Sequence, residues 1–225
     1  MEQIEQLAGK SPVRSLKVSV NPSSWMEVTF TEFYERAYQK GDYYEYFEGN
    51  VRDVIERVQK GQDDLGFVYL LKEQGASAQF LMRKYQLQFE PLKRIQLMLY
   101  GGKKVQNFPP VDGELRLVQG SQTEVRPEDV LRLGAIEGIS LESPQTSVTT
   151  NSGSLLRHLL EHSDLWNLSS ESLDGTYSGT EGILLEGKEN EVVFGCVSRN
   201  EEQLGKLEKE FITYVKKKLK NSKKE

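Results

Sequence analysis

Residues 43–71 read YYEYFEGNVRDVIERVQKGQDDLGFVYLL, and this stretch decides the class of fold. It opens with an aromatic run over 43–47 that is typical of a strand. A helix is predicted over 51–58, because valine and isoleucine recur there at i, i+3, i+4 and i+7 after Asn50, a candidate N-cap. Residues 64–71 are almost continuously apolar, as in a strand that is covered on both faces. The stretch therefore predicts a strand-helix-strand unit.

The same alternation extends toward both ends of the chain. Residues 16–20 alternate like a strand, and Pro22-Ser23-Ser24 supplies the start of a helix. Proline and glycine become frequent after Gly101-Gly102 and are mixed with short strands over 103–128, so a second and smaller unit is predicted to begin close to Tyr100. Further strands are predicted over 87–92, 95–100, 133–139, 146–150, 182–185 and 192–197, and further helices over 79–85, 153–162 and 204–219. We therefore expect an α/β protein with a largely parallel sheet.

Composition and charge exclude several classes of protein. With 37% hydrophobic and 28% charged residues, the 225-residue chain resembles an ordinary globular protein. Residues 207–225 hold seven lysines and three glutamates, a net charge of +4. Because the whole chain has a net charge of −5, residues 1–206 carry −9. This acidic segment disfavours nucleic-acid binding by the chain itself. We expect no disulfide, because Cys196 is the only cysteine, and no secretory signal or membrane span is recognisable.

The sharpest chemical motif is His158-Leu159-Leu160-Glu161-His162, which matches the H-x-x-E-H pattern of some zinc proteases. On a helix the two histidines share a face, so they could hold Zn²⁺ while Glu161 acts as a general base. A catalytic zinc also needs a third protein ligand, and no later residue stands in a motif that suggests one. We therefore expect no metal site, with zinc hydrolysis as an unfavoured alternative.

A second group of candidates follows the predicted strands. Val20, Phe47 and Thr150 each end a strand and are followed by small or hydroxyl residues that begin a helix. Ligands of α/β proteins bind beyond the carboxyl ends of strands, where free helix N–H groups and hydroxyls favour anions. The same residues are ordinary helix caps, so ligand binding and capping both remain open.

Three motifs together carry a resemblance to a known family. They are the Pro22-Ser23-Ser24 helix start, the strand end Phe47-Glu48-Gly49-Asn50, and the turn Gly61-Gln62-Asp63-Asp64-Leu65-Gly66-Phe67. In this order the sequence resembles the effector-binding domain of LysR-type transcriptional regulators, and the turn is the most specific part. Residues 92–100 resemble the crossover strand of that family, residues 125–130 a short helix after it, and residues 192–219 the return to the first lobe.

The resemblance implies a two-lobed fold like that of type II periplasmic binding proteins, each lobe a mainly parallel sheet flanked by helices. Residues 1–12 would be the remnant of a linker helix, residues 13–99 with 190–225 would form lobe I, and residues 100–189 would form lobe II. The family's N-terminal helix-turn-helix is missing before the first strand. We expect one of two explanations: the chain is part of a longer protein that carries the helix-turn-helix, or the chain is a natural stand-alone effector domain.

The family's ligand positions fall on residues of both lobes and of the crossover between them. They are Ser23, Ser24, Asn50, Tyr69, Tyr100, Ser152, Gly153 and Ser154. Such domains bind small-molecule effectors, here expected to be an organic anion, and pair as homodimers or higher homo-oligomers. DNA would be contacted only through the missing N-terminal domain.

Three classes of function compete for this sequence. A ligand-sensing regulatory domain in the cytoplasm, with no enzymatic activity, no cofactor and no membrane contact, is the favoured interpretation. A stand-alone solute-binding protein would need an export signal or a lipid-attached cysteine near the start, and Cys196 is far from it. A zinc hydrolase would rest on His158, Glu161 and His162 alone.

Overall fold

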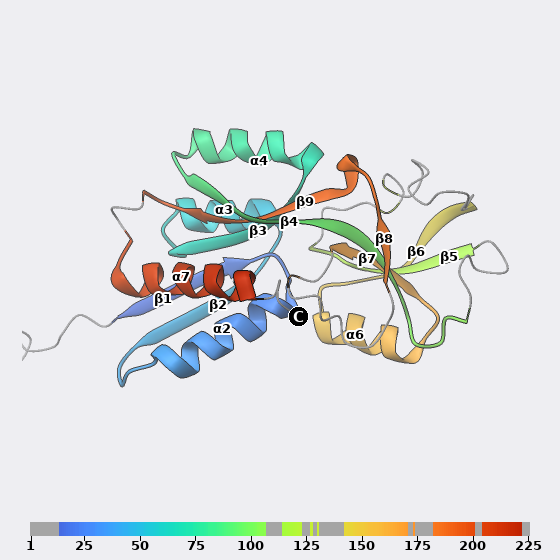
Figure 1. The fold of residues 1–225 in the computed structure, drawn as a ribbon, viewed down its shortest axis with the longest axis horizontal. Helices are drawn as coiled ribbons and strands as arrows, with labels where there is room; N and C mark the ends of the chain where they lie inside the picture. The colour runs from blue at the N-terminus through green and yellow to red at the C-terminus, as the bar shows by residue number, and fades with distance from the viewer. Residues whose placement is uncertain are drawn as a thin grey trace, which may run out of the picture.

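The computed structural model describes residues 14–106, 114–122, 127, 130, 142–170, 173, 182–200 and 204–221. These residues form two α/β lobes joined by a long strand that belongs to both (Figure 1). The predicted fold class, with two lobes of the periplasmic-binding-protein type, is confirmed. The predictions for residues 1–12, for most of 125–130 and for 133–139 lie outside the described residues.

Lobe I contains five strands in the order β2-β1-β3-β9-β4. β1 pairs in parallel with β2 and β3, whereas β9 is antiparallel to both β3 and β4. Four strands therefore run in one direction and β9 runs against them, so the lobe is mainly parallel. The strands are β1 (Ser15–Val20), β2 (Tyr43–Glu48), β3 (Leu65–Leu71), β4 (Gln88–Gly101) and β9 (Glu191–Ser198).

Lobe II is built on the second part of β4. β7 and β8 both pair antiparallel with β4, and β5 pairs in parallel with β6 and β7. Here too one described strand, β4, runs against the others. The strands are β5 (Glu114–Gly120), β6 (Glu142–Thr150), β7 (Trp166–Ser170) and β8 (Gly182–Leu185), and a 3-10 turn, η1 (Lys188–Asn190), leads into β9.

The strand directions determine which ends of the two lobes face each other. β4 pairs with β9 up to Gln96 and with β7 and β8 from Leu97, so it passes from lobe I into lobe II. β1, β2 and β3 run in the same direction as β4, and their carboxyl ends therefore point toward lobe II. β5 and β6 run against β4 and end toward lobe I. The helices that follow β1, β2 and β6 thus begin at the facing edges of the lobes.

Helices cover both faces of the lobe I sheet (Figure 1). On one face, α2 (Ser24–Ala37) and α7 (Lys206–Asn221) pack against each other, with the rings of Phe33 and Phe211 4.9 Å apart. On the other face, α3 (Val51–Gln59) and α4 (Lys72–Lys84) cover β3. The amphipathic stripe predicted for α3 is fully buried there. In lobe II, α6 (Gly153–His162) packs through Leu160 against Val118 of β5.

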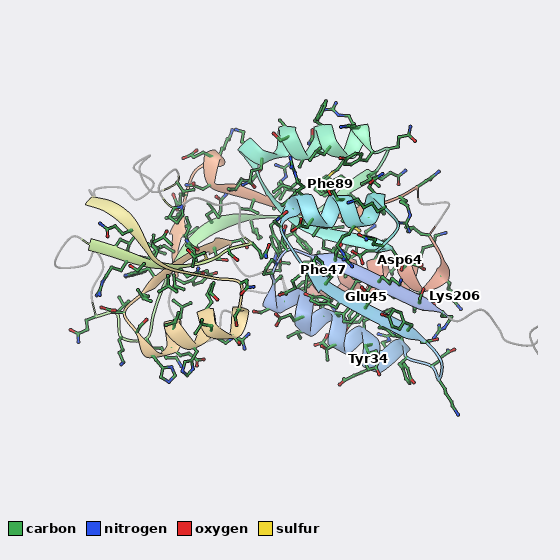
Figure 2. The ribbon with its side chains drawn as sticks, turned by 180° about the vertical axis from the view of Figure 1, so that it is seen from behind. Tyr34, Glu45, Phe47, Asp64, Phe89 and Lys206 are labelled. Carbon is green, nitrogen blue, oxygen red and sulfur yellow. The ribbon has the colours of Figure 1, made fainter. Side chains whose placement is uncertain are left out.

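The two faces of β2 show the alternation of a strand clearly. Tyr46 faces α2, where its ring lies 5.1 Å from that of Phe30. Glu45 and Phe47 point to the opposite face (Figure 2), where Arg57 of α3 pairs with Glu45 and lies 3.9 Å over the Phe47 ring. Side chains at even positions of β2 therefore belong to the α2 face, including that of Glu48.

Most predicted elements are found, with three corrections. α4 is 13 residues long rather than the short helix predicted over 79–85, because Gly75 does not interrupt it. The two strands predicted over 87–92 and 95–100 are one strand, β4, with a register shift between Pro91 and Lys93. β7 was not predicted at all.

The domain boundaries at residues 100 and 190 stay a prediction. None of the described helices is long and apolar enough to cross a membrane.

Candidate functional site

The ends of β1, β2 and β3 are tied together by one buried side chain, that of Asn21. Its Nδ2 donates a hydrogen bond to the carbonyl oxygen of Gly49 (2.9 Å), and its Oδ1 accepts one from the backbone N–H of Tyr69 (3.0 Å). Asn21 is 7% exposed and follows directly after β1. This amide therefore holds the three strand ends, and the helix starts that follow two of them, in one fixed arrangement.

Ser23 and Tyr69, two of the predicted ligand positions, are in direct contact. The Ser23 Oγ accepts a hydrogen bond from the backbone N–H of Met26 (3.3 Å) and so caps α2. The same oxygen lies 2.7 Å from the Tyr69 hydroxyl oxygen. Ser24, the first residue of α2, is exposed. The hydroxyl groups of Ser23 and Tyr69 thus form a polar pair at the lobe I edge.

Asn50 is the cap of α3, as the sequence predicted. Its Oδ1 accepts a hydrogen bond from the backbone N–H of Asp53 at 2.9 Å. Gly61, the first residue of the turn motif, lies two residues after the end of α3 with φ at +69°. The Asn50 side chain is half-buried, and its observed role is to cap α3.

An acidic group that the sequence interpretation did not include lies beside Ser23. Glu48 ends β2 on the face toward α2, where Glu27 and the backbone N–H of Ser23 act on its carboxyl group. Burial, and after it the charge of Glu27, raise the pKa of Glu48 against the opposing effect of that N–H. Among the described residues, the buried Oε1 of Glu48 and the buried hydroxyl of Tyr46 make no hydrogen bond of normal geometry, although the two groups act on each other's pKa. Burial, followed by the charge of Glu48, raises the pKa of Tyr46. The lobe I edge is therefore acidic and rich in hydroxyl groups.

The lobe II edge has a different electrostatic character. Ser152 caps α6, because its Oγ accepts a hydrogen bond from the backbone N–H of Leu155 (3.2 Å). The Ser152 Oγ also lies 3.0 Å from that of Ser154, and the Ser152 N–H donates to the Thr150 hydroxyl (3.0 Å). Gly153 and Ser154 are exposed, and the first turn of α6 carries no acidic residue. The positive end of the helix dipole is thus exposed without an acidic side chain to balance it.

Tyr100 is the one predicted ligand residue that the structure does not bring to this region. It lies near the far end of β4, opposite Asn167 of β7 and Gly182 of β8, and is only 1% exposed. Its hydroxyl group donates to the carbonyl oxygen of Ser170 at 3.3 Å. Tyr100 is therefore part of the interior of lobe II.

The histidines of the H-x-x-E-H motif lie on α6, as predicted, and both are exposed. Within the described part of the chain, the only group of three or more possible metal ligands is this motif itself. Cys196 is 3% exposed in β9, and burial, with a smaller effect of Glu90, raises the pKa of its thiol to about 12. Neither group has the features of a catalytic centre, which needs an activated nucleophile or a further metal ligand.

Comparison with known proteins identifies the fold through structure only. No family model and no curated protein matches the sequence. The C-terminal domain of a probable LysR family transcriptional regulator from Rhodococcus sp. RHA1 superimposes with a TM-score of 0.58 at 18% identity, over 90% of this chain and 98% of that one. The regulatory domain of HypT from Salmonella typhimurium, in a bromide-bound form, gives a TM-score of 0.61 at 13% identity, over 95% and 98%.

A full-length regulator shows the same similarity over part of its chain. CbnR, a LysR family transcriptional regulator, gives a TM-score of 0.55 at 11% identity, over 97% of this chain and 74% of its own. The resemblance predicted from the sequence is therefore confirmed at the level of the fold: two of these solved structures are of LysR family transcriptional regulators and the third is a regulatory domain.

Proposed function

We propose that this chain is a ligand-sensing regulatory domain of a LysR-type transcriptional regulator, without enzymatic activity, that binds a small-molecule effector between its lobes. The observation that carries the proposal is the position of the helix starts. The capped N-termini of α2, α3 and α6 lie at the facing edges of the two lobes, where a ligand can contact both. Similarity of fold to regulatory domains of this kind supports it.

The side chains at the two edges suggest the chemistry of the effector. On the lobe I side, Glu48 and the paired hydroxyls of Ser23 and Tyr69 favour a ligand group that donates hydrogen bonds, such as an amine or amide. On the lobe II side, Ser152 and Ser154 at the α6 N-terminus favour an anionic group. We expect an organic anion that also carries a hydrogen-bond donor.

Partners and location follow from the same proposal. DNA would be contacted by a domain outside this chain, since the part before residue 207 is acidic. The protein would work as a homodimer or higher homo-oligomer in the cytoplasm. Effector binding would change the angle between the lobes and so reposition the DNA-binding domains.

The test is binding of metabolites to four proteins: wild type, Ser23→Ala, Glu48→Gln and, as a matched control, Ser77→Ala. Ser77 is an exposed serine inside α4 and belongs to none of the capped N-termini of α2, α3 and α6. Native mass spectrometry of each protein with a pool of amino acids and organic acids reads bound mass and subunit number together. A ligand that binds wild type and Ser77→Ala but is lost in the other two variants supports the proposal.

Two results would count against it. A ligand bound equally by all four proteins would lie elsewhere, and an anion without a donor group that binds equally to wild type and Glu48→Gln would contradict the role of Glu48. Loss of the Ser23 cap costs about 1 kcal/mol of stability by itself. Unfolding temperatures of all four proteins therefore separate lost binding from lost folding.

A further inference from the structure

Three ligand-bearing side chains that the proposed function does not use gather on one face of α6. His158, Glu161 and His162 stand at i, i+3 and i+4, and their possible ligand atoms all lie within 4.8 Å of one another. These are the only two histidines of the chain, and both are exposed. An ion in solution can therefore reach the group without any change in the fold.

The two imidazole rings lie next to each other on the helix. They stack with centroids 4.2 Å apart and an interplanar angle of 28°. The Nδ1 of His162 lies 3.0 Å from the carbonyl oxygen of His158. When Nδ1 carries the proton it donates to this carbonyl, and Nε2 keeps the lone pair that binds a metal. Metal-binding histidines are commonly oriented by such a bond.

The place of the group on the helix also favours a cation. His162 is the last residue of α6, so the group occupies the turns where the helix dipole is negative. A single positive ion there interacts favourably with the terminal carbonyl groups as well as with the Glu161 carboxylate.

We propose that His158, Glu161 and His162 bind one divalent transition-metal ion, of the kind represented by Zn²⁺, at the surface of lobe II. Two imidazole nitrogens and one carboxylate oxygen match the preference of Zn²⁺, and water completes its coordination. The site holds the ion without catalysing a reaction. The chain's single thiol, Cys196, is buried in β9 and does not contribute.

The experiment is a titration of the 225-residue protein, prepared without a histidine tag, with zinc chloride. Calorimetry gives the affinity and stoichiometry. Because the chain has only two histidines, two-dimensional NMR of the imidazole C–H groups reports on this site alone. The variants are His158→Gln, His162→Gln and Glu161→Gln, with Glu35→Gln, an exposed glutamate of α2, as the matched control.

The proposal expects one Zn²⁺ per chain and shifted signals from both imidazoles. Each histidine variant should bind more than about tenfold more weakly, Glu161→Gln should bind more weakly than wild type, and Glu35→Gln should be unchanged. Unshifted imidazole signals at several-fold excess of zinc would overturn the proposal, as would unchanged affinity in the histidine variants. A stoichiometry of one ion per two chains would mean that Zn²⁺ bridges copies, which also overturns a site within one helix.

Discussion

Gly66 of β3 is where the packing of lobe I leaves no room for a side chain. A Cβ added at this position would lie 2.6 Å from Val54 Cγ1 and 3.1 Å from Val58 Cγ2, both on α3. The two valines are fully buried, and a valine on a helix has one strongly preferred rotamer, so their methyl groups cannot swing aside. Gly66→Ala must therefore push α3 away from the sheet. Overpacking of this kind costs about 1–3 kcal/mol.

The matched control is the same substitution in α4. A Cβ at Gly75 meets nothing within 4 Å, and glycine inside a helix is less favourable than alanine by about 0.5–1 kcal/mol. Gly75→Ala should therefore stabilise the protein, which separates the two variants by about 1.5–4 kcal/mol. For a chain of this size, Gly66→Ala should lower the unfolding temperature by about 2–12 °C.

Urea unfolding followed by circular dichroism measures both free energies of unfolding under the same conditions. Shifts of the same sign in the two variants would refute the reasoning, because the chemical change is identical and only the surroundings differ. Wild-type stability for Gly66→Ala would show that α3 can move away from β3 without cost.

Three further changes test other parts of the structure. Asn21→Ala removes the partner of two buried backbone groups, at Gly49 and Tyr69, and should lower the free energy of urea unfolding by about 2–4 kcal/mol; a loss under about 0.5 kcal/mol would contradict the bridging role. The folded state raises the pKa of Glu48 from 4.5, so it holds this proton more tightly than the unfolded state, and stability is lost as pH rises above that value. Glu48→Gln should therefore be more stable than wild type near neutral pH, and the difference should shrink as the pH falls toward 4.5; a difference that stays constant from neutral pH down to 4.5 would refute this. Cys196, with a pKa of about 12, should react with a disulfide reagent only after unfolding in urea, and rapid reaction of the native protein would contradict its burial.

Local signals allowed much of the fold to be predicted. The stripe of α3 and its Asn50 cap depend on residues within a few positions of each other, and both are found as expected. β7 was missed because its sequence, Trp166 to Ser170, is short and half polar. Asn167 is nevertheless buried, with only 4% of its surface exposed. Its polar side chain is tolerated there because its Nδ2 donates a hydrogen bond to the Val118 carbonyl oxygen at 2.8 Å. A buried polar residue with a distant partner breaks the apolar pattern on which strand prediction relies.

The candidate site divides in the same way between local and distant contacts. The caps formed by Ser23, Asn50 and Ser152 are local, and sequence alone indicated them. Asn21 acts on residues 28 and 48 positions away, so nothing near it in the chain shows what it does. For Glu48, by contrast, the sequence did contain an indication of where its side chain lies. The alternation of β2 places it on the α2 face with Tyr46, at the end nearest the α2 N-terminus.

The point at which β4 changes its partner strands differs from the point at which its sequence pattern ends. Near Tyr100 the sequence breaks at Gly101-Gly102, and this break marks the end of β4. The strand changes partners earlier, between Gln96, which pairs with Glu191 of β9, and Leu97, which pairs with β7 and β8. The alternation of β4 continues through this point, because exchanging one neighbouring strand for another leaves the pleat unchanged. For the change in lobe angle proposed above, we expect β4 to bend where its partners change, four residues before the position at which its sequence pattern ends.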